Sequence, residues 1–274
     1  MTAGAEHSID AMLKTAILAA REAGELIRRA ARDVGARAVR SKQVNDFVSA
    51  VDTAAERTIL GILRADWPDH EVLAEESGLS GAAAGVDGYQ WIVDPLDGTT
   101  NFLHGVPQYA VSIALRRGRE LTLAVVNDPL KGELFTATRG GGAFLNGQRI
   151  SVSEPRELHR CLIGTGIPFR NQASLDQYVA MLRDLSHRTA GLRRMGAAAL
   201  DLAYLACGRF DGFWELDLLP WDMAAGALLI TEAGGLVGDV DGGPDYLERC
   251  NLVAGNAVTF PALVELCRAT RPPA

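Results

Sequence analysis

The order of the expected helices and strands predicts a mixed α/β (α+β) fold made of layered helices and sheets. Apolar residues recur at helical spacing over residues 9–32, and an alternating pattern broken by turn signals covers residues 111–152. Beyond Pro155, strands and helices alternate. We therefore expect an N-terminal α+β half, residues 1–154, and a C-terminal α/β half, residues 155–274.

The first two expected elements are helices. The first is amphipathic, and its apolar positions are Ile9, Met12, Leu13, Ala16, Ile17 and Ala20. A pair such as Glu25 with Arg29 contributes only about a few tenths of a kcal/mol, so packing must hold this helix. The second helix is expected over Thr53–Leu63, where Asp52 is most simply read as its N-cap.

Short strands and turns follow the helices. Val72 and Leu73 read as a strand that ends near Glu75, and the Gly- and Ala-rich run Gly78–Gly88 reads as a mobile surface loop. An antiparallel meander over Val111–Val152 is then expected, because turn signals divide the alternating pattern. These signals are Asn127-Asp128-Pro129, Lys131-Gly132 and Asn146-Gly147.

The glycines Gly140–Gly142 have two readings, a nucleotide-binding loop or a hairpin. They lack both G-x-G-x-x-G and a G-K-[ST] ending, so the hairpin is favoured. In the C-terminal half the expected strands and helices are Cys161–Thr165, Leu175–Ser186, Ala197–Ala206, Gly212–Glu215, Asp222–Ala233 and a final helix near Ala262–Arg268.

The segment Trp91–Phe102 (W-I-V-D-P-L-D-G-T-T-N-F) carries the strongest chemical signal. Asp94 and Asp97 flank a stiff, proline-containing turn, where two unpaired carboxylates would repel by roughly several kcal/mol unless a cation lay between them. Oxygen ligands favour Mg²⁺ over zinc. The following Gly98, Thr99 and Thr100 suit an anion site at a helix start. The segment alone is equally consistent with an Asp-rich turn that caps a helix.

A second segment begins at Trp221-Asp222 and runs to Gly235 as W-D-M-A-A-G-A-L-L-I-T-E-A-G-G. It reads as a helix with an acidic first turn, a small-residue face for close packing and a glycine stop. The two segments together resemble the signatures of the inositol monophosphatase family, and the resemblance covers nearly the whole chain. It implies an αβαβα sandwich of the inositol monophosphatase and sugar phosphatase type, with the site between the two halves.

The resemblance also implies roles for individual residues. Glu75, Asp94 and the Leu96 carbonyl would hold a first Mg²⁺, and Asp94, Asp97 and Asp222 a second, with two or three ions per site. Asp52 and Thr99 would orient the attacking water. The amides of Gly98, Thr99 and Thr100 would bind the phosphoryl oxygens.

The alcohol part of the substrate would meet other residues. Gly196, Ala197 and Ala198 match a small-residue segment that borders the substrate, and Glu215 matches the acid that holds inositol hydroxyls. A serine contact of some relatives has no counterpart between Gly164 and Phe169, where the only hydroxyl is Thr165. Thr165 is therefore left out of the expected site.

Composition narrows the remaining possibilities. A net charge of -7 argues against a broad nucleic-acid surface. The four cysteines form no C-x-x-C pair, so neither a zinc nor a redox motif is indicated. No run reaches the roughly 18 to 20 apolar residues of a membrane span, and the N-terminus does not read as a signal peptide. We expect a cytoplasmic protein.

The expected function is Mg²⁺-dependent hydrolysis of inositol 1-phosphate by a homodimer that lithium inhibits. Two alternatives remain open. One is a phosphatase for histidinol phosphate, fructose bisphosphate or a 3'-phosphoadenosine nucleotide on the same scaffold. The other is an accessory binding role in transcription antitermination, with a transcription factor rather than RNA as the direct partner.

Overall fold

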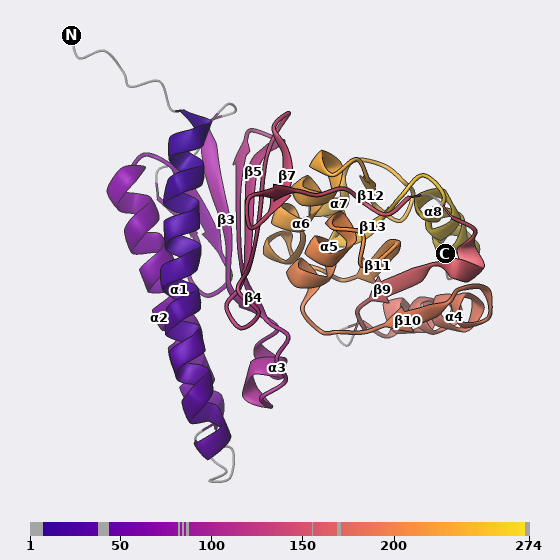
Figure 1. The fold of residues 1–274 in the computed structure, drawn as a ribbon, viewed down its shortest axis with the longest axis horizontal. Helices are drawn as coiled ribbons and strands as arrows, with labels where there is room; N and C mark the ends of the chain where they lie inside the picture. The colour runs from indigo at the N-terminus through magenta and orange to yellow at the C-terminus, as the bar shows by residue number, and fades with distance from the viewer. Residues whose placement is uncertain are drawn as a thin grey trace.

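The computed structural model of the protein describes residues 8–37, 44–81, 83, 85, 88–154, 156–168 and 171–271. Figure 1 shows five layers in the order helix, sheet, helix, sheet, helix, as the family resemblance implies. The helices are α1 (Ile9–Arg37), α2 (Val44–Asp66), α3 (Thr99–Leu103), α4 (Gln172–Arg188), α5 (Ala198–Ala206), α6 (Pro220–Glu232), α7 (Tyr246–Arg249) and α8 (Thr259–Ala269).

The first sheet has the strand order β2-β1-β3-β4-β5-β6-β7-β8. Its strands are β1 (Glu71–Ala74), β2 (Gly78–Ser80), β3 (Tyr89–Asp97), β4 (Ala110–Arg117), β5 (Glu120–Asp128), β6 (Glu133–Thr138), β7 (Gly142–Leu145) and β8 (Gln148–Arg149). From β3 to β8 every neighbouring pair is antiparallel, which confirms the meander. The β7–β8 turn has positive φ at both Asn146 and Gly147, as an Asn-Gly hairpin requires.

Two expectations for the N-terminal half are wrong. Gly78–Ser80 is not loop but strand β2, because it pairs antiparallel with β1 and so gains ladder hydrogen bonds. Of the remaining loop, residues 82, 84, 86 and 87 lie outside the described residues. Helix α2 begins at Val44, so Asp52 lies inside the helix and is not its N-cap. The apolar spacing in the sequence continues upstream of Asp52, through Val48 and Phe47 to Val44.

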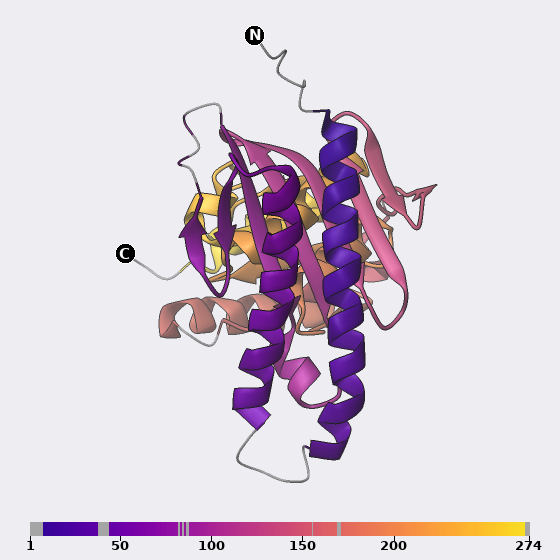
Figure 2. The same cartoon turned by 90° about the vertical axis from the view of Figure 1, so that its left-hand side faces the viewer.

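Helix layers cover both faces of the first sheet (Figures 1 and 2). Alternating residues of its strands pack against different layers. On β4, Val111, Ile113 and Leu115 pack in the core against α1 and α2. Ala110 and Ala114 pack in the core against α5 and α6. The small residues let α6 approach closely, which sets its N-terminus beside the end of β3.

The second sheet has the strand order β10-β9-β11-β13-β12. Its strands are β9 (Leu162–Thr165), β10 (Gly191–Arg193), β11 (Gly212–Leu216), β12 (Leu236–Gly238) and β13 (Asn251–Gly255). Helices α5 and α6 cover one face, and a separate core of α4 and α8 residues covers the other. The expected elements of this half are all present. Elements that the sequence did not predict in the described part of this half are β10, β12, α7, β13 and a short 3₁₀ helix, Leu158–Arg160. Within the described residues, the helices include none that combines the length and apolar character of a membrane span.

Candidate active site

A bulge in β3 places two carboxylates on one side of the strand. In a regular strand, residues three apart point to opposite faces. Between Asp94 and Asp97 the pairing of β3 with β4 shifts register, and Pro95 and Leu96 fall in the shift. The Leu96 amide donates to Asp94 Oδ1 at 2.9 Å, which fixes that carboxylate. The stiff turn expected from the sequence is therefore a bulge that redirects Asp97.

Gly98 turns the chain from β3 into α3. Its φ is +89°, and a Cβ there would lie 2.8 Å from the backbone oxygen of Gln108. The turn leaves the first backbone amides of α3 without partners inside the helix. The Thr99 hydroxyl donates to the Leu96 carbonyl at 2.9 Å.

The third carboxylate comes from the C-terminal half. Helix α6 starts at Pro220, and Asp222 in its first turn accepts a hydrogen bond from the Leu219 amide at 2.7 Å. Gly226 on the same helix packs on α5, since a Cβ there would lie 2.4 Å from Leu202 Cβ. The small-residue face predicted for this helix is therefore used for helix packing.

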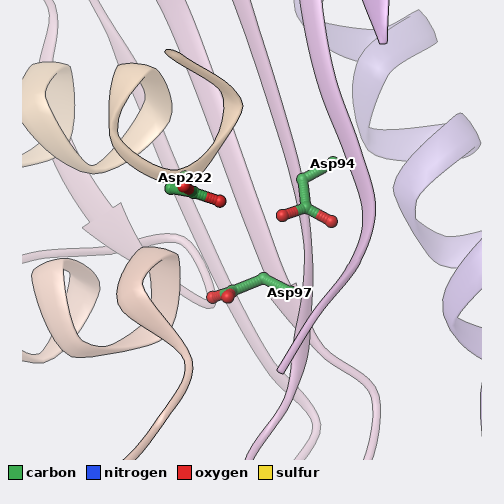
Figure 3. A group of neighbouring side chains, drawn as sticks. All are labelled: Asp94, Asp97 and Asp222. Atoms are coloured by element: carbon green, nitrogen blue, oxygen red, sulfur yellow. The ribbon is translucent and has the colours of Figure 1, made fainter. Parts of the chain in front are cut away.

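Asp94, Asp97 and Asp222 converge, as Figure 3 shows. One carboxylate oxygen from each lies within 4.8 Å of the others. Asp94 and Asp97 are buried, and Asp222 is half-buried. This is the arrangement that the sequence predicted for a shared cation.

Burial and mutual repulsion make the acid forms of these groups favourable. Burial raises the pKa of Asp97 to about 8, and the Asp222 charge adds to the shift. Burial also raises the pKa of Asp94 well above its usual range, and Glu75, Asp97 and Asp222 contribute. Protons or bound cations would therefore stabilise this cluster.

This electrostatic arrangement predicts how the stability of the metal-free protein depends on pH. A carboxyl group with a raised folded-state pKa stabilises the fold below its unfolded pKa, near 4, and loses that contribution as the pH rises through the folded pKa. For Asp52 and Asp97 the folded values are about 7 and about 8. Thermal unfolding of EDTA-treated protein should therefore show a Tm that falls from pH 5 to pH 8. A Tm that is flat or rises over this range would contradict the prediction.

Glu75 and Asp52 lie beside the cluster. Glu75 directly follows β1, as expected, and its carboxyl group hydrogen-bonds with Asp94, which raises the pKa of Asp94. Asp52 is buried, and burial together with Glu76, Glu75 and Glu56 raises its pKa to about 7. The buried Asp52 Oδ1 has no hydrogen-bond partner among the described residues. An unpaired buried carboxylate oxygen beside the cluster is a suitable acceptor for a water molecule.

Asp97 also connects the two halves of the chain. Its Oδ2 accepts a hydrogen bond from the Ala199 amide, at 2.8 Å and 102 residues away, in the first turn of α5. Asn101 Nδ2 donates to the carbonyls of Met195 and Gly196. These contacts hold the segment Gly196–Ala198 against the turn at Gly98, so three of the residues expected to border the substrate lie beside those expected to bind phosphate.

A cavity of about 400 Å³ opens between the two halves. Its lining joins Gly98, Thr99, Thr100, Gly196, Glu215 and Asp222. A smaller cavity of about 130 Å³ shares Gly196, Glu215 and Asp222 with it, and Ala197, Ala198 and Asp97 also line that one. The expected phosphate-binding and alcohol-binding residues therefore lie around adjacent cavities, together with two of the expected metal ligands, Asp97 and Asp222.

Glu215, at the end of β11, lines both cavities. Burial, with the charges of Asp222 and Asp97, raises its pKa to about 8, whereas Arg194 opposes the shift. The Glu215 carboxylate lies over Gly166, where an added Cβ would come within 1.8 Å of Oε1. Glu215 is thus a half-buried acid that lines the cavities rather than a solvated strand end.

The sequence analysis missed other residues of the site. Arg194 and Asp201 line the cavities, as does Thr165, which was left out of the expected site. Asp201 is buried and accepts from Gln108 Nε2 at 3.3 Å. Glu56 is buried one turn after Asp52 and accepts the Glu76 amide at 2.9 Å. Only Glu56 had a signal in the sequence, its i,i+4 spacing from Asp52.

The donor set fits hard divalent cations. All the side chains that converge are carboxylates, and the buried cluster Asp94, Asp97 and Asp222 contains no cysteine or histidine. Carboxylate and carbonyl oxygens suit Mg²⁺, Mn²⁺ or Ca²⁺. The raised pKa values of Asp94 and Asp97 mean that a bound cation would stabilise their ionised forms.

Comparison with known proteins agrees with this geometry. The model of the inositol monophosphatase family matches residues 8–271. A Pseudomonas aeruginosa protein named Nus factor SuhB is 51% identical over 265 residues, which cover 96% of this chain and 97% of that protein.

Two solved structures show the same fold. The extragenic suppressor protein suhB from Bartonella henselae has a TM-score of 0.83 and 41% identity, covering 94% of this chain and 99% of that one. An inositol monophosphatase from Anabaena (Nostoc) sp. has a TM-score of 0.83 and 36% identity, covering 97% and 98% of the two chains.

Proposed function

Since the chain belongs to the inositol monophosphatase family, we propose that it is a phosphatase that uses Mg²⁺ to release phosphate from inositol 1-phosphate. The observation that supports this best is the convergence of Asp94, Asp97 and Asp222 within 4.8 Å, at the edge of a cavity that also contains the start of α3 and Glu215. Carboxylates, backbone amides and a polyol-binding acid are then in one place.

The proposal assigns the cations to the expected ligands. Glu75, Asp94 and the Leu96 carbonyl would hold one Mg²⁺, and Asp94, Asp97 and Asp222 another, with a total of two or three. When bound, these ions would activate a water molecule and neutralise charge on the phosphoryl and leaving oxygens. Lithium sensitivity, expected from the family resemblance, belongs to the same proposal.

The chain's own residues position the reactants. The Thr99 hydroxyl and the unpaired Asp52 Oδ1 would orient the attacking water. For this Thr99 would turn from the Leu96 carbonyl, to which it donates in the structure. The amides of Gly98, Thr99 and Thr100 would donate to phosphoryl oxygens, where such preorganised donors act most strongly. Nothing in this scheme requires a covalent phosphoenzyme.

The alcohol part of the substrate would lie between Glu215 and the segment Gly196–Ala198. A carboxylate accepts hydrogen bonds from adjacent hydroxyls, so Glu215 favours a polyol over histidinol phosphate or a nucleotide. A phosphate-release assay with Mg²⁺ and a panel of inositol 1-phosphate, histidinol phosphate, fructose bisphosphate and a 3'-phosphoadenosine nucleotide tests this. A clear preference for any substrate other than inositol 1-phosphate would overturn the assignment.

Glu215→Gln should lower kcat/KM for inositol 1-phosphate by an amount that corresponds to roughly 1 to 3 kcal/mol of lost transition-state stabilisation. The reason is that a hydrogen-bond acceptor for hydroxyls is replaced by a poorer one. Hydrolysis of 4-nitrophenyl phosphate, which has no such hydroxyls, should barely change. Glu157→Gln, at an exposed position outside the cavities, is the matched control. Equal losses on both substrates would mean that Glu215 supports the fold or the metals instead.

The relatives named Nus factor SuhB favour a second candidate, the accessory role in transcription antitermination. A pull-down of transcription factors with wild-type protein and with Asp94→Asn tests it independently of catalysis. Retention of the same partners by the inactive variant would establish a binding role.

We further propose a cytoplasmic homodimer, with residues 1–154 and 155–274 as the halves that meet at the site.

A further inference from the structure

A second cavity, of about 350 Å³, lies between α2 and the β1–β2 hairpin, away from the large cavity beside Asp222. Figure 2 shows the helix and the hairpin side by side. The cavity is lined by Thr53, Glu56, Arg57, Leu60, Gly61, Arg64, Ser77 and Ser80. Of the site residues described above, only Glu56 is among them.

Two guanidinium groups border this cavity. Arg57 and Arg64 are seven residues apart on α2, so they project from the same side of the helix with α-carbons about 10 Å apart. Both residues are exposed. Arg64 donates to Ser80 Oγ at 2.8 Å, and no ion pair joins either arginine to a carboxylate in the described part of the chain.

The lining contains one acid, Glu56. Glu56 is buried, and its Oε2 accepts a hydrogen bond from the Glu76 amide at 2.9 Å. The lining therefore carries two exposed guanidinium groups and the hydroxyls of Ser77 and Ser80 against one buried carboxylate, on a protein whose net charge is -7. Such a local surplus of donors attracts anions where the overall charge would not.

The helix surface at Gly61, which lines the cavity, has open space beside it. A Cβ added to Gly61, between the two arginines, would have no neighbour within 4 Å. Glycine inside a helix lowers helix stability relative to alanine, and here it leaves space on the helix surface. The volume and the spacing of the arginines suit a ligand with more than one anionic group.

We propose that this cavity binds a polyphosphate anion, of which diphosphate is the smallest example. Each guanidinium can donate two parallel hydrogen bonds to one phosphate group, which a single orthophosphate would not satisfy at both ends. Ser77 and Ser80 would donate to the remaining oxygens from the hairpin. Thr53 borders the same space from α2.

Isothermal titration of diphosphate into the full-length protein in EDTA at low salt tests the proposal. Without divalent cations the cluster around Asp94 repels anions, so the measured binding reports the cavity at α2. Arg57→Gln/Arg64→Gln should weaken diphosphate binding at least tenfold. Arg160→Gln/Arg183→Gln, which removes the same charge from exposed sites elsewhere, should change it less than twofold.

Gly61 provides a second pair of variants that leaves the arginines in place. Gly61→Asp puts a carboxylate on this helix surface and should abolish binding, whereas Gly61→Ala, with open space around its Cβ, should retain it. Orthophosphate should bind wild-type protein at least tenfold more weakly than diphosphate. Absent binding to the wild type, equal losses in the two double variants, or equal affinities for the two anions would overturn the proposal.

Discussion

Removal of divalent cations with EDTA is expected to abolish phosphate release, and Mg²⁺ added in excess should restore it. The physical reason is the cluster of Glu75, Asp94, Asp97 and Asp222, in which burial and neighbouring carboxylates raise the pKa of Asp94 and Asp97, and bound cations would offset both effects. Phosphate monoesters are among the slowest biological bonds to hydrolyse, so without the ions the rate should fall below detection.

Phosphate release is measured after dialysis against EDTA and again after stepwise addition of Mg²⁺. Zn²⁺ serves as a comparison, since an all-oxygen donor set should favour Mg²⁺ for activity. Full turnover in excess EDTA would exclude the proposed mechanism. Recovery of phosphate release with Zn²⁺ but not with Mg²⁺ would contradict the preference for Mg²⁺ that the carboxylate donor set predicts.

Asp94→Asn is expected to have the largest effect of any single substitution. Asp94 is assigned to both cations, contacts Glu75, and is oriented by the Leu96 amide at 2.9 Å. Thr99→Ala removes one hydroxyl that orients water, for which a loss of roughly 10²- to 10³-fold is typical of a single catalytic hydrogen-bond donor. The loss in Asp94→Asn should exceed that value.

Steady-state rates at saturating Mg²⁺ give the order of the two effects. Circular dichroism of Asp94→Asn should show a folded protein, because asparagine has nearly the same shape and removes charge repulsion from the cluster. If Asp94→Asn turned over at nearly the wild-type rate, or lost less than Thr99→Ala, its bridging assignment would be wrong.

Local patterns predicted most of the fold. Apolar spacing gave α1, the Asn-Gly pair gave the β7–β8 hairpin, and the small-residue run gave α6. The same kind of reasoning failed at Asp52, because a residue that suits an N-cap also occurs inside a longer helix. Short edge strands such as β2 and β12 each pair with one neighbouring strand, β1 and β13, and three residues are too few to show a strand pattern of their own.

The site was less predictable from local patterns alone. The family resemblance named the expected ligands. Asp94 and Asp97 lie on the same side of β3 because of a register shift, and that shift depends on pairing with β4. The hydrogen bond between Asp97 and the Ala199 amide joins residues 102 positions apart. Asp201 and Arg194 reach the cavities through packing between the two halves, so no short motif could indicate them.

Gly166 lies directly under the carboxylate of Glu215, where a Cβ would come within 1.8 Å of Oε1. Oε1 is at the end of a flexible side chain, so an alanine at position 166 would displace the Glu215 carboxylate with little loss of folding stability. The carboxylates of the metal cluster would remain where they are. Under the proposed role of Glu215, a single change at Gly166 would alter substrate preference during evolution, while the carboxylates of Asp94, Asp97 and Asp222 are inherited unchanged.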